Sequence, residues 1–143
     1  MQWDRKEWLS LLAKSEWERL ASCLPDFQNK FLNLREPEVG AVMVQGRAGG
    51  TGKPFNVGEV TVTRASVQLE SGEQGHGYVR GQNKDKALAI AKLDALLQTE
   101  AYHSLADQVL VPLQAAYEAS HKAIAEKAEA TKVDFFTLVR GED

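Results

Sequence analysis

The chain has 143 residues, the length of one ordinary domain, and we expect a single domain over residues 1–143 with one core. Hydrophobic residues make up 43% and charged residues 26%, close to the averages for soluble globular proteins, which argues against a disordered chain. With 17 Lys and Arg against 20 Asp and Glu, the net charge of -3 argues against a dedicated nucleic-acid binder. No stretch approaches the roughly 20 apolar residues of a membrane span, and charges interrupt the N-terminal apolar residues. We therefore expect no membrane contact and a cytoplasmic location.

The first part of the chain has a helical pattern. Ser15 followed by Glu18 has the spacing of a capping box, and Pro25 ends or bends the second helix. The polar stretch up to Pro37 indicates a connector with some local helix. Two short helices meeting near Lys14 and Ser15 are predicted by the spacing of the apolar residues Trp8, Leu11, Leu12, Leu20 and Leu24.

Three segments in the middle of the chain have the composition of strands. Val39–Gly46, VGAVMVQG, is almost continuously apolar, which predicts a central strand covered on both faces. In Gly58–Leu69 the apolar parity changes partway along, which predicts a bulge near Thr63 and Arg64. The polar loop Glu70–Gln74 then leads to Gly75–Arg80, so we expect an antiparallel hairpin.

The remainder is mainly helical. Asn83 or Asp85 can cap a helix that ends near Thr99, and its apolar stripe consists of Ala89, Ile90, Leu93, Leu96 and Leu97. A long helical pattern follows and extends to Ala130, with Pro112 expected to kink it or to start its second part. The terminal Val133–Val139, VDFFTLV, favours either a returning strand or an arm that pairs with a partner. The expected fold class is α+β, an antiparallel sheet of three to four strands packed with N-terminal helices and two long C-terminal helices.

The segment Gly46–Gly58, GRAGGTGKPFNVG, is rich in glycine and lies between two predicted strands. Backbone amides in such a loop can turn toward an anion, and the flanking cations can neutralise its charge. It differs from the nucleotide-binding loop G-x-x-x-x-G-K-[ST], because Arg47 takes the place of the first glycine, Pro54 that of the Ser or Thr, and a strand follows where that motif needs a helix. A plain flexible hairpin loop is the alternative. The candidate binding residues are Arg47, Gly49, Gly50, Thr51, Gly52 and Lys53.

A longer phrase containing this loop resembles a known family. Glu38–Arg64, EVGAVMVQGRAGGTGKPFNVGEVTVTR, resembles the signature of PhnG, a subunit of the carbon-phosphorus lyase system. Thr131–Asp143, TKVDFFTLVRGED, resembles the C-terminal end of that family, and Gly75–Gln98 and Val109–Ala116 fall in the same order between the two. The resemblance thus covers nearly the whole chain.

This resemblance implies a subunit of a large complex in phosphonate catabolism. Such a complex displaces adenine from MgATP by a phosphonate and yields ribose 1-phosphonate 5-triphosphate. The implied partners include the nucleosidase subunit and the radical lyase subunit, and MgATP is the substrate of the complex. We expect no cofactor bound by this chain alone, because one cysteine, Cys23, could not hold an iron-sulfur cluster.

Two arginines and one histidine are the first candidates for contact with a ligand or a partner. Arg47 and Arg64 flank the loop, and a guanidinium can bind a phosphate through two parallel hydrogen bonds. An ion pair with Glu59, or with a carboxylate of a partner, is an equally weighted alternative. His76 lies on a predicted strand, and an imidazole is a side chain suited to proton transfer to departing adenine. No residue can be assigned a catalytic role from the sequence.

Other residues indicate packing or contacts with other subunits. Trp3 and Trp17 belong to a cluster of tryptophans larger than two short helices need, and Trp8 is the one expected in the core. Near the C-terminus, Phe135 and Arg140 are candidates for a protein interface. Cys23 is expected to be a small buried hydrophobe, and the histidines lack metal-ligand spacing, so no metal site is predicted.

Three functions stay open at this point. The chain could be an obligatory subunit that is inactive in isolation, a small enzyme with its own site at Gly46–Gly58, or a non-catalytic structural adaptor of the complex. Turnover by the isolated protein would favour the second. Intact turnover after removal of Arg47 and Arg64 would favour the third.

Overall fold

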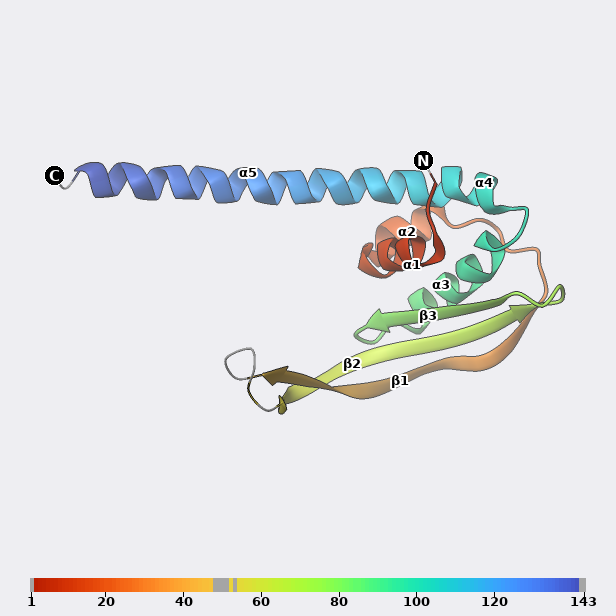
Figure 1. Cartoon of the computed structure of the whole chain (residues 1–143). Helices are drawn as coiled ribbons and strands as arrows, with labels where there is room; N and C mark the ends of the chain where they lie inside the picture. The colour runs from red at the N-terminus through yellow and green to blue at the C-terminus, as the bar shows by residue number, and fades with distance from the viewer. Residues whose placement is uncertain (1, 48–51, 53, 142–143) are drawn as a thin grey trace.

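The computed structural model describes residues 2–47, 52 and 54–141, without the side chains of residues 47, 54, 56, 57 and 130–141. Figure 1 shows the helices on one side of a single sheet, whose other face is bare. The predicted α+β class, with its antiparallel sheet, N-terminal helices and long C-terminal helix, is confirmed. In chain order the elements are α1 Arg5–Lys14, α2 Trp17–Cys23, β1 Phe31–Arg47, β2 Pro54–Leu69, β3 Gln74–Arg80, α3 Lys84–Leu97, α4 Tyr102–Leu105, the π-helical turn η1 Ala106–Leu110 and α5 Val111–Gly141.

The sheet has three antiparallel strands in the order β1-β2-β3. The predicted hairpin between β2 and β3 is confirmed, and Gly72, with a φ of 105°, supplies the left-handed backbone of its turn. The prediction of a central strand at Val39–Gly46 is wrong, because this segment belongs to β1 at the edge of the sheet. Its apolar side chains are largely exposed, with 51% exposure at Met43.

Two further predictions about the strands are wrong. The connector expected up to Pro37 is already strand, since β1 begins at Phe31 and its edge position tolerates a proline. The bulge expected in β2 is absent from its pairing with β3, which runs without a shift from Val62 to Gln68. The pairing of β2 with β1 does shift beside Arg64, but the extra residue there lies in β1, between Arg35 and Glu38. Two further shifts lie between Asn33 and Arg35 and between Val44 and Gln45. Thr63 therefore stays on the buried face of β2, where its hydroxyl donates to the carbonyl of Gly81 at 2.6 Å.

Helix α3 covers the inner face of the sheet. Asn83 caps it, as predicted, by accepting a hydrogen bond from the amide of Lys86 at 2.9 Å. The helix lies so close to β3 that a Cβ added at Gly75 would stand 1.9 Å from the carbonyl oxygen of Ala91, and one at Gly77 at the same distance from that of Ala87. Glycine facing alanine is what allows this approach. All five residues of the predicted apolar stripe of this helix are buried.

The N-terminal helices meet near Lys14 and Ser15, as predicted. The prediction of a capping box at Ser15 is wrong. Glu16 is the N-cap of α2, and the Ser15 hydroxyl donates to the carbonyl of Leu12 at 2.7 Å. The end of α1 is held instead by Lys86, whose ammonium donates to the carbonyls of Ala13 and Ser15 at 3.1 and 2.7 Å. At the end of α2, Cys23 is half-buried and packs against the core, so it is less covered than expected.

Helix α5 runs from Val111 to Gly141, and Pro112 lies in its first turn, in agreement with the prediction of a second helical part starting there. The helix does not end at Ala130, and residues 133–139 continue it, so the returning strand predicted for them is wrong. Its C-terminal part extends far beyond the rest of the molecule (Figure 1). No helix in the described ranges combines the length and apolar content needed to cross a membrane.

Candidate functional site

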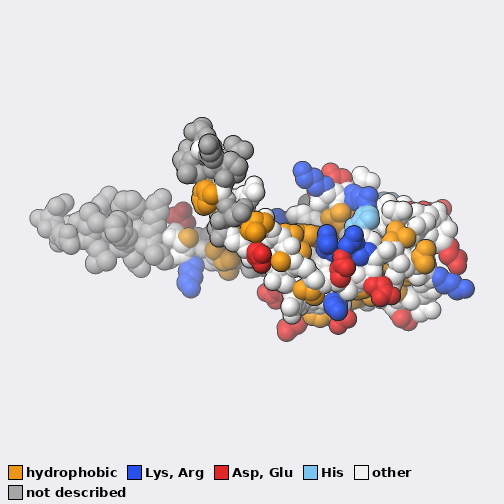
Figure 2. All heavy atoms as spheres, turned by 90° about the horizontal axis from the view of Figure 1, so that it is seen from below, with side chains coloured by type: hydrophobic (Ala, Val, Ile, Leu, Met, Phe, Trp, Pro, Cys, Tyr) orange, Lys and Arg blue, Asp and Glu red, His pale blue; other side chains and the backbone are white. Residues whose placement is uncertain are grey.

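The bare face of the sheet holds two of the predicted site residues. Side chains alternate along a strand, so the residues of β2 and β3 that do not face α3 point outward together. Arg64 of β2 pairs with Glu38 of β1 on one side and with Tyr78 of β3 on the other, and Ser66 pairs with His76 in the next row. Figure 2 shows basic side chains gathered beside a histidine on this face. We call the group Arg35, Glu38, Arg64, Ser66, His76, Tyr78 and Arg80 the outer-face cluster.

Glu38 joins two arginines in this cluster. One of its carboxylate oxygens, Oε1, accepts a hydrogen bond from Arg35 and another from Arg64, the latter at 3.3 Å. All three side chains are about half-exposed, so each ion pair contributes little to stability and can exchange partners. The alternative of an ion pair between Arg64 and Glu59 is wrong, because the register of β1 and β2 brings Glu38 next to Arg64 instead.

His76 lies next to the arginines on β3. Its Nδ1 lies 2.8 Å from the hydroxyl of Ser66, which fixes the orientation of the exposed imidazole ring. Arg80, also exposed, stands opposite Val62 at the end of the same strand. The cluster therefore combines three guanidinium groups and an imidazole with one carboxylate, an arrangement suited to binding a phosphate or a carboxylate group.

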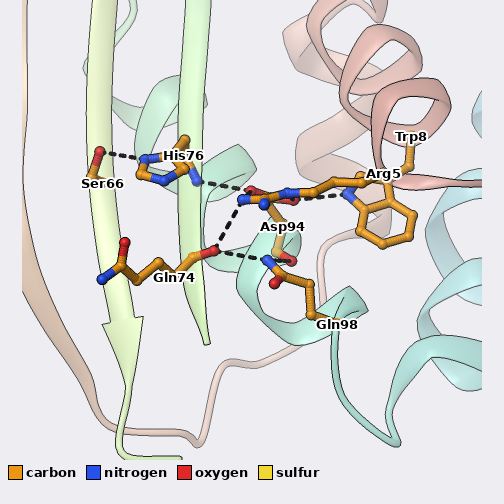
Figure 3. A network of polar contacts seen from close by, with 7 residues as sticks. All are labelled: Arg5, Trp8, Ser66, Gln74, His76, Asp94 and Gln98. Atoms are coloured by element: carbon orange, nitrogen blue, oxygen red, sulfur yellow. Dashed lines mark hydrogen bonds and ion pairs between the residues drawn. The ribbon is translucent and has the colours of Figure 1, made fainter. Parts of the chain in front are cut away.

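Directly behind His76 lies a buried carboxylate, Asp94 of α3 (Figure 3). It accepts four hydrogen bonds: from Nε and a terminal nitrogen of Arg5 at 3.1 and 2.9 Å, from the indole of Trp8 at 2.9 Å, and from the backbone amide of His76 at 2.9 Å. The carboxylate thus connects α1, α3 and β3 at one point. Hydrogen bonding to Asp94 raises the pKa of Arg5 above its ordinary value, despite the opposing effect of partial burial.

A second junction lies beside the first. The carbonyl oxygen of Gln74 accepts hydrogen bonds from Arg5 at 3.2 Å and from the side-chain amide of Gln98 at 2.7 Å (Figure 3). The beginning of β3 is therefore attached both to α1 and to the end of α3. Together with the Asp94 contacts, this holds the backbone that carries His76 in place.

The sequence interpretation missed Asp94 and Arg5. A signal was present, because Asp94 falls between buried positions of the apolar stripe of α3, and a carboxylate in such a place needs buried partners. Their identity could not be read from the sequence, since Arg5 lies 89 positions away along the chain.

The glycine-rich loop is only partly described. Gly49, Gly50, Thr51 and Lys53 lie outside the described residues, and Gly52 stands in the bend between β1 and β2. Arg47 is the last residue of β1, where it pairs with Pro54, but its side chain is outside the description. In the register of the sheet Arg47 is at the hairpin end, whereas Arg64 pairs near the middle of β1, so the two predicted arginines are not neighbours.

The predicted interface residues differ in their surroundings. Trp3 is 7% exposed and belongs to the core, with its backbone amide donating to the hydroxyl of Tyr102 at 2.7 Å. Trp8 is buried, as predicted, and Trp17 is half-buried against the core. The side chains of Phe135 and Arg140 lie outside the described part of α5. The roles of Trp3, Trp17, Phe135 and Arg140 at an interface stay predictions.

Other hollows and ligand sets do not coincide with the cluster. A cavity of about 1010 Å³ lies between the connector before β1, the β2-β3 turn and helix α4, and neither Arg64 nor His76 lines it. Among the described residues, no group of three or more His, Cys, Asp or Glu has the placement of metal ligands. The outer-face cluster is thus an open surface, which fits a site completed by another molecule.

Comparison with known proteins agrees with the resemblance carried by the glycine-rich phrase. The model of a family described as phosphonate metabolism protein PhnG matches residues 3–141. The chain is 42% identical over 142 residues to the alpha-D-ribose 1-methylphosphonate 5-triphosphate synthase subunit PhnG of Rhizobium meliloti (strain 1021), with 98% of this chain and 91% of that relative covered. On these matches, which span almost its full length, the chain belongs to the PhnG family.

Proposed function

We propose that this chain is a subunit of an alpha-D-ribose 1-methylphosphonate 5-triphosphate synthase and acts in phosphonate metabolism. The observation that carries the proposal is the 42% identity to a subunit of that name over nearly all of both chains. The family match over residues 3–141 supports it independently of any short motif. A named subunit implies other chains, so the protein works as part of an assembly.

The proposed reaction follows from the product named in the relative. A phosphonate oxygen attacks the anomeric carbon of the ribose of MgATP, and adenine leaves as the triphosphate stays on the 5-position. Such a substitution needs an electrophile held in place and screening of the triphosphate charge. The nucleosidase and radical lyase subunits of the carbon-phosphorus lyase complex are the proposed partners, and the cytoplasm is the proposed location. MgATP enters as a substrate of the assembly.

Within this assembly the outer-face cluster is the proposed contribution of the chain to substrate or partner binding. Arg64 shares the carboxylate of Glu38 with Arg35 in a half-exposed ion pair that an incoming anion can replace. His76 is exposed beside it on a backbone fixed by Asp94. Because the cluster is an open surface, a second subunit is needed to exclude water from it.

A purely structural adaptor is the second candidate. It is favoured by the exposed apolar side chains of β1 and β2, among them Met43 and Phe55, which serve contact with protein rather than chemistry. In that case the cluster contacts a partner and never a ligand. The two candidates predict different turnover for an assembled complex that lacks the side chains of the cluster. Turnover falls if the cluster binds substrate and stays normal if it only contacts a partner.

The test is reconstitution of the synthase with and without the chain, followed by release of adenine from MgATP in the presence of methylphosphonate. The isolated chain should release none, the complex lacking it should be inactive, and the complete complex should turn over. Arg64→Ala combined with His76→Ala should lower turnover by about 10- to 100-fold in an assembled complex, the loss expected for a charge-assisted hydrogen bond. Arg19→Ala removes an exposed arginine with a similar ion pair on α2 and is the matched control.

Full turnover of the assembled double variant would support the adaptor. A complete complex that is equally active without the chain would contradict the proposed function itself. Assembly is followed separately, by light scattering during size-exclusion chromatography, so that a lost contact is not mistaken for lost chemistry.

A further inference from the structure

The part of the sheet beyond β3 is a ribbon of two strands. It consists of Val39–Gly46 in β1 and Phe55–Thr61 in β2, and we call it the distal ribbon. Strand β3 pairs with β2 only from Val62 to Gln68. Val39 and Gly40 stand opposite Thr63 and Val62, so the ribbon has no third strand from Ala41 onward. Figure 1 shows it projecting past β3, in the same direction as the C-terminal part of α5.

The distal ribbon exposes apolar side chains on both of its faces. Val39 and Met43 lie on the face that continues the helix-covered side, and Val44 lies on the other, because side chains alternate along β1. Their exposed fractions are 39%, 51% and 39%, and Phe55 across the ribbon is 50% exposed. The sequence of β1 has no charged residue between Glu38 and Arg47. Natural edge strands usually carry charges or prolines against unwanted pairing, and this stretch has none.

An isolated two-stranded ribbon is at best marginally stable in water. The apolar pattern of Val39–Gly46 predicts a strand covered on both faces. The described residues of this chain cover neither face of it. The pattern and the exposure are reconciled if another polypeptide supplies the cover. Strand β1 is the edge of the sheet formed by the described residues, where a strand from another chain can be added.

The neighbouring charges decide between a second copy and a different chain. The bare face continues from the ribbon into the outer-face cluster, where three arginines, Arg35, Arg64 and Arg80, stand against one glutamate, Glu38. A twofold pairing of two copies through this face would bring one basic cluster against the other. Like charges at such close range oppose association, whereas an acidic surface favours it.

We propose that the distal ribbon is embedded in a different subunit of the synthase, which covers it with an apolar groove, adds a strand to the edge of β1 and places acidic residues against Arg35, Arg64 and Arg80. This rests on the proposed function, because it needs a complex with other chains. The ribbon is then an assembly element, and the cluster at its base lies at the boundary between two subunits.

The experiment compares the free chain with the assembled complex by hydrogen exchange and tests assembly of two matched variants. In the free, monomeric chain the amides of Val39–Gly46 should exchange quickly, and in the complex their exchange should slow by at least about tenfold as they gain hydrogen bonds and cover. Met43→Glu should lower the yield of complex by at least about tenfold, because a carboxylate enters an apolar groove. Val111→Glu alters a similarly exposed apolar residue, 46% against 51%, at the start of α5 and should assemble as the native chain does.

Thermal unfolding of the free variants should match that of the native chain, which shows that Met43→Glu acts on assembly and not on folding. Unchanged exchange of Val39–Gly46 in an assembled complex, or normal assembly of Met43→Glu, would overturn the inference and leave the proposed function intact. A free chain that dimerises with a protected ribbon would also overturn it, in favour of a second copy. Failure of the native chain to assemble with any synthase subunit would overturn the proposed function, and the inference with it.

Discussion

The two halves of the sheet are built from one long hairpin but have opposite surroundings. In the covered half, β2 packs against α3 and β3, and its inward residues Thr63, Ala65 and Val67 are at most 1% exposed. In the distal ribbon the same strand faces no helix, and Phe55 at its beginning is half-exposed. Strand β2 thus changes from ribbon to core within a few residues. What a strand contributes to stability depends on the elements that cover it, and only secondarily on its own composition.

The same contrast appears in the glycines. In the covered half, Gly75 and Gly77 let β3 approach the backbone of α3, because any Cβ there would collide with a carbonyl oxygen. In the ribbon, Gly40 and Gly58 have nothing within 4 Å of where a Cβ would stand. Identical residues therefore have a packing role in one half and none in the other.

The largest expected difference between the two halves is in the free energy of unfolding that is lost when a carboxylate is removed. Asp94→Ala removes a buried acceptor and leaves the Trp8 indole and the His76 amide without their partner. Arg5 keeps access to water, since its side chain is 45% exposed, so most of the loss comes from the two other donors. We expect a decrease of about 2–5 kcal/mol in the free energy of unfolding, measured by urea denaturation.

Glu38→Ala is the counterpart at the base of the ribbon. Glu38 has two arginine partners, but all three side chains are about half-exposed, so the decrease should stay below about 1 kcal/mol. Similar losses from the two substitutions would contradict the division of the sheet into a covered and an uncovered half.

The glycines give the second test. In Gly77→Ala the new methyl group would stand 1.9 Å from the carbonyl oxygen of Ala87, so β3 and α3 must separate, and we expect a loss of about 1–3 kcal/mol. Gly40→Ala fills open space and reduces the freedom of the unfolded chain, so we expect a gain of about 0.4–1 kcal/mol. The measurement is the thermal midpoint of each variant. Changes of equal sign would show that the packing of α3 on β3 is not as close as described.

The elements that local patterns determine could be predicted. The apolar stripe of α3 and its Asn83 cap, the two N-terminal helices and the β2-β3 hairpin all follow from spacing and turn residues, and all are present. The sequence also points to part of the candidate site, because two of its candidate residues, Arg64 and His76, lie in adjacent rows of one face.

What failed depends on contacts between distant segments. The apolarity of Val39–Gly46 indicates cover, but it does not say whether that cover comes from this chain or from another. The pattern therefore predicts a central strand where the structure has an edge strand. The partners of Asp94, and the pairing of Arg64 with Glu38 instead of Glu59, are set by the packing of α1 and by a register shift in β1. At the C-terminus, aromatic and β-branched residues favoured a strand at 133–139, yet the segment continues α5.

The smallest expected effect is the pH dependence that Lys86, in the covered half, gives to the free energy of unfolding. Burial lowers the pKa of Lys86 below its ordinary value of 10.5, while its ammonium holds the end of α1. Between the lowered folded pKa and 10.5 the unfolded chain binds more protons than the folded one, so the free energy of unfolding should rise with pH in that window. At lower pH the lysine is charged in both states, and its desolvation cost is fully present. Lys86→Met should remove this rise, which we expect to be under about 1 kcal/mol.

Urea unfolding of both proteins from pH 7 to 10.5 gives the difference directly. Burial raises the pKa of the Cys23 thiol, which acts in the opposite sense, since the stability it contributes is lost as the pH rises through its folded pKa. Because Cys23 is present in both proteins, its contribution cancels in their difference. A difference that stays constant with pH would show that Lys86 is solvated despite its contacts with Ala13 and Ser15. The junction of α1 with α3 would then be as open to water as the distal ribbon.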